Sequence, residues 1–343
     1  MINRLHFKAI IVISMLLFAY NCIASVQVYS FKPHGSPDRY LIVAQDGETP
    51  QEALKRYVHL IHRNKSLLEL IGSENFIQFK SGQFSKIEET VSPDKTLVLL
   101  LANRSSDMTY DSQQSPQMRI NKFKQKLNQE HDVYILPVAG AIGLTHPNRD
   151  LYYKQISHIF SGVIALGGHD VNPALYNEKV TYSRDVNPVR DQYEINFLKY
   201  WIQNRKGFLF GVCRGHQLIS AALGFKLSQH IDYHGDGEWT DHKIYLHKTQ
   251  NGYLYDALKV KELAVNSYHH QAVIYKNHPL VDLAATGPDG TVEALESRDG
   301  RIMTTQFHIE FMDNIYAQRF FKYLSYKIKS SSVSKTLKCS NLF

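Results

Sequence analysis

The sequence predicts an α/β fold, in which a mostly parallel sheet is flanked by helices on both faces and an appended helical region precedes it. Between residues 95 and 225, apolar runs alternate with segments of helical periodicity, which is the pattern of βαβ units. These runs are continuously apolar, as expected of strands buried on both faces of a parallel sheet. The 343 residues are enough for one large or two modest domains.

The first 24 residues have the layout of a signal peptide. Arg4 and Lys8 precede an apolar segment, and small residues lead up to Ala24, after which we expect cleavage. The apolar segment is shorter than the roughly 20 residues that a membrane span needs. A single transmembrane anchor and a lipid anchor on Cys22 are the alternatives. We therefore expect a secreted or periplasmic protein without stable membrane insertion once the signal is removed.

The expected elements follow the signal peptide in a simple order. Residues 25–94 contain an amphipathic helix and no chemical motif, so we treat them as an appended region. Residues 95–330 form the α/β domain, and 331–343 form a polar, basic tail. The expected strands of the domain are 96–102, 132–138, 162–168 and 208–212, and its helices are 117–131, 152–160, 189–207 and 214–224. Two further strands, 291–297 and 301–308, are joined through Asp299 and Gly300, which is a hairpin signal.

The charge distribution and the cysteine count exclude some classes of partner and of disulfide-rich fold. The net charge is +7, but the basic residues are scattered and form no arginine-rich run or zinc-finger spacing, so we expect no nucleic-acid partner. After signal removal only Cys213 and Cys339 remain, too few for a disulfide framework. A single disulfide between them stays open. The oligomeric state is left undecided by the sequence.

Cys213 lies in the segment "GVCRG", directly after the apolar run "FLF" and directly before a helical pattern. A residue at such a strand-to-helix turn takes strained backbone angles, and its flanking glycines allow the turn to close. The positive end of the helix favours a thiolate there, and N–H groups beyond it point at the same space. The pattern favours a nucleophile over a buried apolar cysteine.

His308 and Glu310 are the candidate partners of that nucleophile. They stand two residues apart in "QFHIEF", at the end of an expected strand, where both side chains point to one face of the sheet. Glu310 would then orient the imidazole and stabilise its charged form. A solvated surface pair is the alternative explanation of this motif alone.

Taken together, five ordered motifs resemble the class I glutamine amidotransferase-like superfamily, and within it the C26 peptidases of the γ-glutamyl-γ-aminobutyrate hydrolase type. The motifs are "ALGGHDVNPALY", "PVRDQYE", "GFLFGVCRGHQLISAALG", "VNSYHHQAV" and "TTQFHIEF". The resemblance spans about residues 95 to 325 and implies a flavodoxin-like sheet. It also implies a catalytic triad of Cys213, His308 and Glu310.

The resemblance assigns further residues to the site. It implies that the N–H groups of Gly168 and Arg214 form the oxyanion hole. The candidate substrate-binding residues are Gly167, Gln217, Ser267, His269 and His270, and Asp191 with Glu194 would receive an amino group or anchor Arg214. For each of these a structural role is an equal alternative.

The chain departs from the family pattern at several positions. Ile309 replaces the proline that the family usually has between histidine and glutamate, and we expect it to keep the same extended backbone. His169 and His216 stand where small or apolar residues are usual, so we expect the polarity of the pocket to differ from that of the family.

The function that follows is an exported cysteine hydrolase of γ-glutamyl amide bonds, with a small γ-glutamyl substrate and no metal or other cofactor. One rival is a dienelactone-hydrolase-like cysteine α/β-hydrolase, although the "FHIE" ending speaks against it. The other is a binding protein that keeps the fold and has lost turnover.

Overall fold

The structure is a computed structural model that describes residues 26–45, 47–63, 82–87, 92, 94–101, 116–136, 144, 146–204, 207–250 and 252–331. The expected signal peptide, the basic tail beyond Ser331, and with them Cys22 and Cys339, lie outside the described residues. No helix within the described ranges combines the length and the apolar character that a membrane crossing requires.

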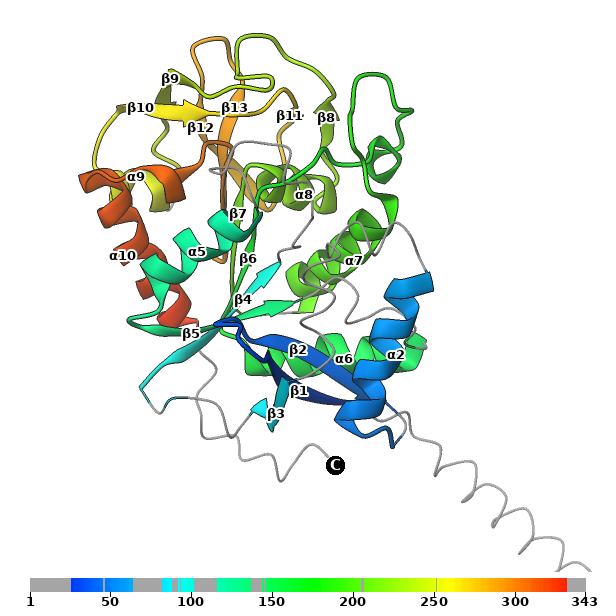
Figure 1. Ribbon diagram of the computed structural model, residues 1–343. Coiled ribbons are helices and arrows are strands. Elements are labelled where there is room, and N and C mark those ends of the chain that lie inside the picture. The colour runs from blue at the N-terminus through cyan, green and yellow to red at the C-terminus, as the bar shows by residue number, and fades with distance from the viewer. Residues whose placement is uncertain are drawn as a thin grey trace, which may run out of the picture.

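A twelve-stranded sheet forms the centre of the molecule (Figure 1). Its middle strands are parallel to their neighbours and confirm the predicted α/β fold class. In spatial order they are β14 (Ile302–Thr305), β7 (Phe208–Val212), β6 (Gly162–Ala165), β4 (Thr96–Leu101), β5 (His131–Leu136) and β2 (Tyr40–Gln45). Four of them coincide with the continuously apolar runs of the sequence.

Antiparallel strands extend this parallel centre on both sides. Beyond β14 lie β13 (Val292–Ser297), β12 (Val281–Thr286), β9 (Thr240–Leu246) and β10 (Glu262–Ser267). The predicted hairpin is confirmed, because β13 and β14 pair antiparallel and Gly300 at their turn has a φ of +71°. A separate two-stranded sheet pairs β8 (Lys226–Ser228) with β11 (Ala272–Ile274).

The N-terminal region differs from the expectation of a helical appendage. Its described residues hold one helix, α2 (Pro50–Arg63), and three strands, β1 (Val26–Pro33), β2 and β3 (Gly82–Lys86). β2 pairs parallel with β5, while β1 pairs antiparallel with both β2 and β3. This region therefore continues the main sheet. β1 and β3 mix buried and exposed positions and therefore form no apolar run. β2, with the sequence YLIVAQ, is buried over its first five residues, and the sequence analysis overlooked it.

Two sets of helices cover the two faces of the central strands. α5 (Pro116–Leu127) and α10 (Ile315–Ser330) pack on one face, and α6 (His146–Ile159), α7 (Pro188–Asn204) and α8 (Arg214–Ala222) pack on the other. Alternate residues of each strand feed the two cores, so that Leu100 faces α5 and α10 while Leu99 faces the other layer. The short α9 (Tyr253–Leu258) lies against α10.

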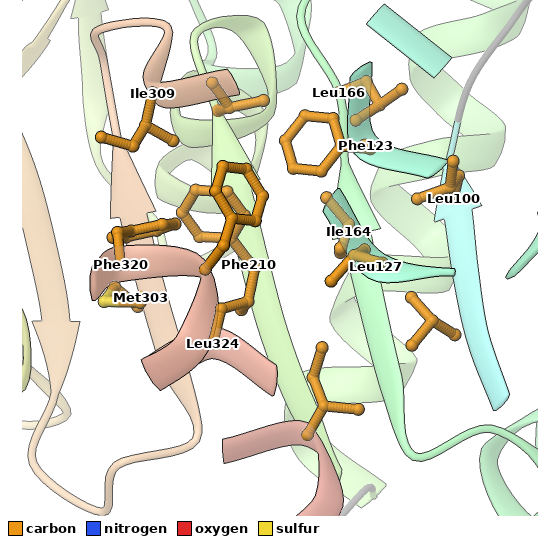
Figure 2. Close-up of a cluster of buried hydrophobic side chains, with 14 of the residues drawn as sticks. Leu100, Phe123, Leu127, Ile164, Leu166, Phe210, Met303, Ile309, Phe320 and Leu324 are labelled. Atoms are coloured by element: carbon orange, nitrogen blue, oxygen red, sulfur yellow. The ribbon is translucent and has the colours of Figure 1, made fainter. Parts of the chain in front are cut away.

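The first of these cores explains the apolar periodicity of α5 and α10. Figure 2 shows Phe123 and Leu127 of α5, together with Phe320 and Leu324 of α10, pointing at Phe210 and Ile164 of the strands beneath. The rings of Phe210 and Phe320 lie 5.1 Å apart between centroids. These contacts hold β7 in place, and they therefore also fix the position of the turn that follows it.

Candidate active site

Cys213 lies at the junction between β7 and α8, at the carboxyl edge of the parallel strands, where ligands bind in sheets of this kind. Its φ of 52° and ψ of −112° belong to a region that side-chain-bearing residues rarely occupy. The Cys213 N–H donates to the carbonyl oxygen of Thr305 at 2.8 Å, which ties the turn to the end of β14. The predicted strand-to-helix elbow is thus present.

The flanking glycines are required by close packing of backbone on backbone. A Cβ at Gly215 would lie 1.9 Å from the carbonyl oxygen of Ala165 on β6. A Cβ at Gly211 would lie 2.7 Å from the carbonyl group of Gly215. The first turn of α8 can therefore rest directly on the sheet, which aims Cys213 outward. The positive φ is carried by the cysteine itself and not by either glycine.

His308 and Glu310 meet, but not on a strand as the sequence analysis expected. β14 ends at Thr305, and residues Ile309–Phe311 form a short 3₁₀ turn with His308 at its N-cap. The expectation of extended backbone at Ile309 is therefore wrong. The turn still allows His308 Nδ1 to donate to Glu310 Oε1 at 2.7 Å, and both side chains are buried.

Asn266 on β10 holds the backbone of His308 from both sides. Its Oδ1 accepts from the His308 N–H at 2.9 Å, and its Nδ2 donates to the His308 carbonyl at 3.0 Å. The Trp239 ring lies edge-on to the imidazole, with 5.3 Å between centroids. Sequence reasoning missed both residues, although Asn266 belongs to the motif "VNSYHHQ", because neither is near His308 along the chain.

The electrostatics of His308 favour its charged form. Burial disfavours the imidazolium, but the neighbouring Glu310 carboxylate and the Cys213 side chain outweigh it and raise the pKa of His308 to about 9. Nε2 has no hydrogen-bond partner among the described residues, so it is the ring nitrogen left free for proton transfer. The Cys213 sulfur lies 3.9 Å from the carbonyl oxygen of Tyr268.

Three groups converge on the α-carbon of Gly167, which follows β6. A Cβ there would lie 3.1 Å from His308 Cε1, 3.4 Å from Arg119 Nε and 3.5 Å from Cys213 Cβ. Arg119, on α5, is 8% exposed, and its Nε has no partner among the described residues. The sequence analysis missed it. The available signal was its spacing, because Arg119 precedes Phe123 and Leu127 by one and two helical turns on the buried face of α5.

Gly168 and Arg214 lie side by side, as the predicted oxyanion hole requires. Within the described ranges, the N–H group of neither residue has a hydrogen-bond partner. A Cβ at Gly168 would lie 2.7 Å from Arg190 Nη1 and 3.2 Å from Arg214 Cδ. A side chain at position 168 would therefore have to displace the Arg190 guanidinium.

Beneath this pair lies a buried network of two arginines and two carboxylates. Arg214 donates to Asp191 and, at 2.5 Å, to Glu194 Oε2, while Arg190 Nε donates to Glu194 Oε1 at 2.9 Å. Burial disfavours the charged form of Glu194, but the two guanidinium groups outweigh it and hold the pKa of Glu194 below its usual value. Of the two roles expected for Asp191 and Glu194, anchoring Arg214 is the one observed.

The expected substrate-binding residues other than Gly167 are engaged inside the protein. Gln217 Nε2 donates to the Gln271 carbonyl and to Gln306, and Ser267 Oγ donates to the His234 carbonyl. His270 Nε2 contacts Asp170 Oδ2 at 2.8 Å. His269 Nδ1 bonds to the Gln271 carbonyl at 3.0 Å. These contacts brace the loop that faces Cys213 and support the structural alternative for each residue.

The sequence of this site matches a family model. Residues 108–310 match the model of Peptidase C26, which is more than half of the chain. The chain belongs to the peptidase C26 family.

Several curated proteins are similar to this C26 chain. The glutamine amidotransferase-like protein YvdE of Lactococcus lactis is 29% identical over 192 residues, which cover 52% of this chain and 75% of YvdE. Rv2859c of Mycobacterium tuberculosis, a glutamine amidotransferase by name, is 30% identical over 186 residues, covering 51% and 59% of the two chains. Protein NtpR of Enterococcus hirae is 32% identical over 173 residues, covering 46% and 69%.

The solved structures that this chain matches include glutamine amidotransferases, with TM-scores below 0.5. The glutaminase domain of CTPS from Trypanosoma brucei, with acivicin bound, has a TM-score of 0.49 at 14% identity, covering 72% of this chain and 98% of that domain. A glutamine amidotransferase from Methylobacillus flagellatus has a TM-score of 0.45 at 11% identity, covering 70% and 96%.

His216 is one of the positions at which this C26 member departs from the family pattern. The sequence analysis expected it to alter the polarity of the pocket. Instead, His216 is fully buried under α8, where its Nδ1 lies 2.8 Å from Thr304 Oγ1 of β14. Burial lowers the pKa of His216 to about 3, so the imidazole is neutral. It is a core residue of the fold.

Proposed function

We propose that the protein is an exported cysteine hydrolase that cleaves γ-glutamyl amide bonds through a thioester on Cys213. Membership of the C26 family already makes it an amide-bond hydrolase or amidotransferase-like enzyme. The observation that carries the finer proposal is the convergence of Cys213, His308 and Arg119 on Gly167. It combines a nucleophile, a proton carrier and a cation for the substrate in one place.

In the first half of the reaction, the Cys213 thiolate attacks the side-chain carbonyl carbon of the glutamyl group. The carbonyl oxygen becomes an oxyanion, which the N–H groups of Gly168 and Arg214 stabilise. His308 then donates its Nε2 proton to the amine nitrogen as the carbon–nitrogen bond breaks. The amine leaves, and the glutamyl group remains on sulfur as a thioester.

In the second half, a water molecule attacks the thioester. His308, now neutral, takes a proton from this water, and a second oxyanion forms in the same hole. The carbon–sulfur bond breaks, which releases glutamate and restores the thiolate. The imidazolium is restored as well. Glu310 keeps Nδ1 protonated throughout, so that Nε2 is the nitrogen that exchanges protons.

Arg119 gives a physical reason for a γ-glutamyl substrate. A guanidinium binds a carboxylate through paired, charge-assisted hydrogen bonds, and the α-carboxylate is the anionic group of a γ-glutamyl compound. Arg119 contacts no carboxylate within the part of the chain that the structure describes. We therefore assign it to the substrate carboxylate. Export rests on the signal-peptide layout of residues 1–24 alone.

The test uses γ-glutamyl-p-nitroanilide and γ-glutamyl peptides with the purified mature chain. Cys213→Ala should abolish hydrolysis, whereas Cys339→Ala, the matched removal of the other thiol, should leave kcat/KM unchanged. Trapping with diazo-oxo-norleucine should add one adduct on Cys213 of the wild type. Hydrolysis that persists in Cys213→Ala would overturn the proposal. Absence of both turnover and adduct would favour the non-enzymatic binding protein.

Arg119→Gln tests the substrate assignment separately. Loss of one charge-assisted pair should raise KM at least tenfold, because such contacts contribute about 1.5–3 kcal/mol, and Arg119→Lys should recover part of it. The KM for a γ-amide that lacks the α-carboxylate should not respond. An equal response to both substrates would contradict the assignment.

A further inference from the structure

A buried carboxylate next to the active site is surrounded by imidazoles. Glu293 of β13 is 0% exposed, and neither of its oxygens has a hydrogen-bond partner among the described residues. Its Oε1 lies 3.2 Å from His242 Nε2, 3.8 Å from His234 Nδ1 and 3.8 Å from His269 Nε2. These three nitrogens also lack partners with hydrogen-bond geometry. We call the four residues the His₃Glu cluster.

This arrangement is unfavourable as it stands. A buried polar atom without a partner destabilises a protein by about 1–3 kcal/mol, and this cluster collects several of them around one point. Neutral imidazoles could offer protons to the carboxylate, but the 3.2 Å contact of His242 does not have the direction of a hydrogen bond. One cation bound at this point would give a partner to each atom that binds it.

Two of the three imidazoles, those of His234 and His269, are already oriented for such a cation. His234 Nε2 bonds to Asp289 Oδ2 at 2.9 Å, so its Nδ1 is directed into the cluster. His269 Nδ1 bonds to the Gln271 carbonyl at 3.0 Å, so its Nε2 carries the free lone pair. Partners of this kind, a carboxylate and a backbone carbonyl on the far ring nitrogen, are what metal-binding histidines have.

We propose that the His₃Glu cluster binds one divalent transition-metal ion, with Zn²⁺ as the best fit. Three imidazole nitrogens and one carboxylate oxygen are ligands that Zn²⁺ accepts in a four-coordinate site. With ligand bonds of about 2.0–2.2 Å, tetrahedral ligand atoms stand about 3.4 Å apart. The distances of 3.2–3.8 Å around Glu293 Oε1 bracket this value. His234, His242 and Glu293 by themselves form a group whose ligand atoms all lie within 4.8 Å of one another. His269 is not part of that group, so its Nε2, although 3.8 Å from Glu293 Oε1, lies farther from at least one of the other two nitrogens and has to approach it to complete the site.

The metal would be structural with respect to Cys213, and it goes beyond the proposed function. His269 directly follows Tyr268, whose carbonyl oxygen faces the Cys213 sulfur at 3.9 Å. Ser267, one residue earlier, bonds to the carbonyl of the ligand His234. The ion would therefore tie the segment 234–239, β9, the 268–271 loop and β13 together on one side of the nucleophile.

The test measures metal directly in the full chain. Protein saturated with Zn²⁺ and dialysed should retain about one ion per chain by elemental analysis. X-ray absorption should show only nitrogen and oxygen neighbours at about 2.0–2.1 Å. Cys213→Ala should retain the ion in full, so a failure of the proposed enzyme function leaves this result unaffected. A sulfur neighbour at about 2.3 Å would place the ion on Cys213 and overturn the proposal.

Two variants test the assignment of the ligands. Glu293→Gln should abolish retention of Zn²⁺. Asp289→Asn, at a half-exposed position outside the core, should weaken Zn²⁺ binding about 10- to 100-fold against a chromogenic chelator while the circular dichroism spectrum stays unchanged. His230→Gln, in a separate and more exposed His/Asp group with His270 and Asp236, is the matched control and should bind as the wild type does. No retained ion in the folded wild type, or loss of the ion in His230→Gln, would refute the cluster as the site.

Discussion

Cys213 is held in a strained backbone conformation by the packing around it. A non-glycine residue in a sparsely populated φ/ψ region loses about 1–3 kcal/mol of stability, and Cys213 combines a positive φ with a ψ of −112°. The strain places its side chain above the carboxyl edge of the sheet, beside His308. The sequence predicted this position because the elbow is a local motif, in which strand, turn and helix are contiguous.

The pH dependence of hydrolysis follows from His308. Its pKa is raised from the usual 6.5 to about 9, against the effect of burial, by Glu310 and Cys213. The imidazolium therefore persists below pH 9 and is lost above it, so kcat/KM should fall on the alkaline side with an apparent pKa near 9. Glu310→Gln removes the carboxylate and should move this limb toward the usual value. A pH–rate profile from pH 5 to 10 measures both.

This account would be contradicted if the alkaline fall in kcat/KM of the wild type had an apparent pKa near 6.5. It would also be contradicted if Glu310→Gln left that apparent pKa unchanged. The free energy of unfolding should also decrease toward alkaline pH. Because the folded-state pKa exceeds the unfolded one, the contribution of His308 is fully present below pH 6.5 and is lost as the pH rises through about 9.

Gly167 predicts a change in activity without a change in fold. A methyl group there would lie 3.1 Å from His308 Cε1 and within 3.5 Å of Arg119 Nε and Cys213 Cβ. Gly167→Ala should therefore lower kcat/KM by 10-fold or more, since displacement of catalytic groups by about 1 Å can lower rates 10²-fold. Thermal unfolding should shift by only a few degrees. Full activity in Gly167→Ala would show that the three groups do not act together.

At the scale of elements, α8 is positioned by contact of its backbone with the sheet. Its N-terminal turn rests on β6 through Gly215, and its buried side chains pack against α7 and β7. The same placement buries His216 against Thr304. Sequence reasoning predicted the helix and its flanking glycines, but it took His216 for a pocket residue because it could not tell which face of α8 meets the sheet.

Gly215→Ala should destabilise the protein strongly. The added Cβ would lie 1.9 Å from the Ala165 carbonyl oxygen. The clash can be relieved only if α8, which contains Gly215, or β6, which contains Ala165, moves. We expect a loss of about 3 kcal/mol or more in the free energy of unfolding, measured by urea denaturation. Ala222→Ser, at the half-buried end of the same helix, should change it by about 0.5 kcal/mol or less. Similar values for the two variants would contradict the contact.

At the scale of the whole molecule, the sequence predicted the parallel centre and missed what surrounds it. Continuous apolar runs specify strands that are buried on both faces, and they specify little else. Asn266 and the His₃Glu cluster depend on contacts between segments far apart in the chain, so no local pattern predicts them. For Arg119 the helical spacing to Phe123 and Leu127 predicts burial, but not the active site that it faces. The predicted triad, by contrast, needed only two short motifs.

Buried neutral histidines should make the protein sensitive to acid. Burial lowers the pKa of His131 to about 4 and that of His216 to about 3. Below pH 6.5 the unfolded chain binds protons that the folded chain does not, so stability present above pH 6.5 is lost as the pH falls toward 3. For His216 this amounts to roughly 2–3 kcal/mol between pH 7 and 4.

Replacement of His216 isolates this effect. Glutamine does not titrate. The free energy of unfolding of His216→Gln should therefore fall less between pH 7 and pH 4 than that of the wild type. This comparison is unaffected by any stability that the variant already loses at pH 7. The exposed His158 provides the control, and His158→Gln should keep the wild-type difference. An unchanged difference in His216→Gln would rule out His216 as a source of acid sensitivity.

The order of the strands decides which fragments of this protein keep the sheet intact. The family match begins at residue 108, yet β4, which ends at Leu101, lies between β6 and β5 and pairs with both. A fragment trimmed to the matched residues would lose this strand, and with it α10 beyond residue 310. The edges of β5 and β6 that pair with β4 would then expose unpaired N–H and C=O groups, and such edges pair with strands of other chains. Expression of the domain alone is therefore expected to yield aggregates, and soluble protein requires the chain from β1 to the end of α10.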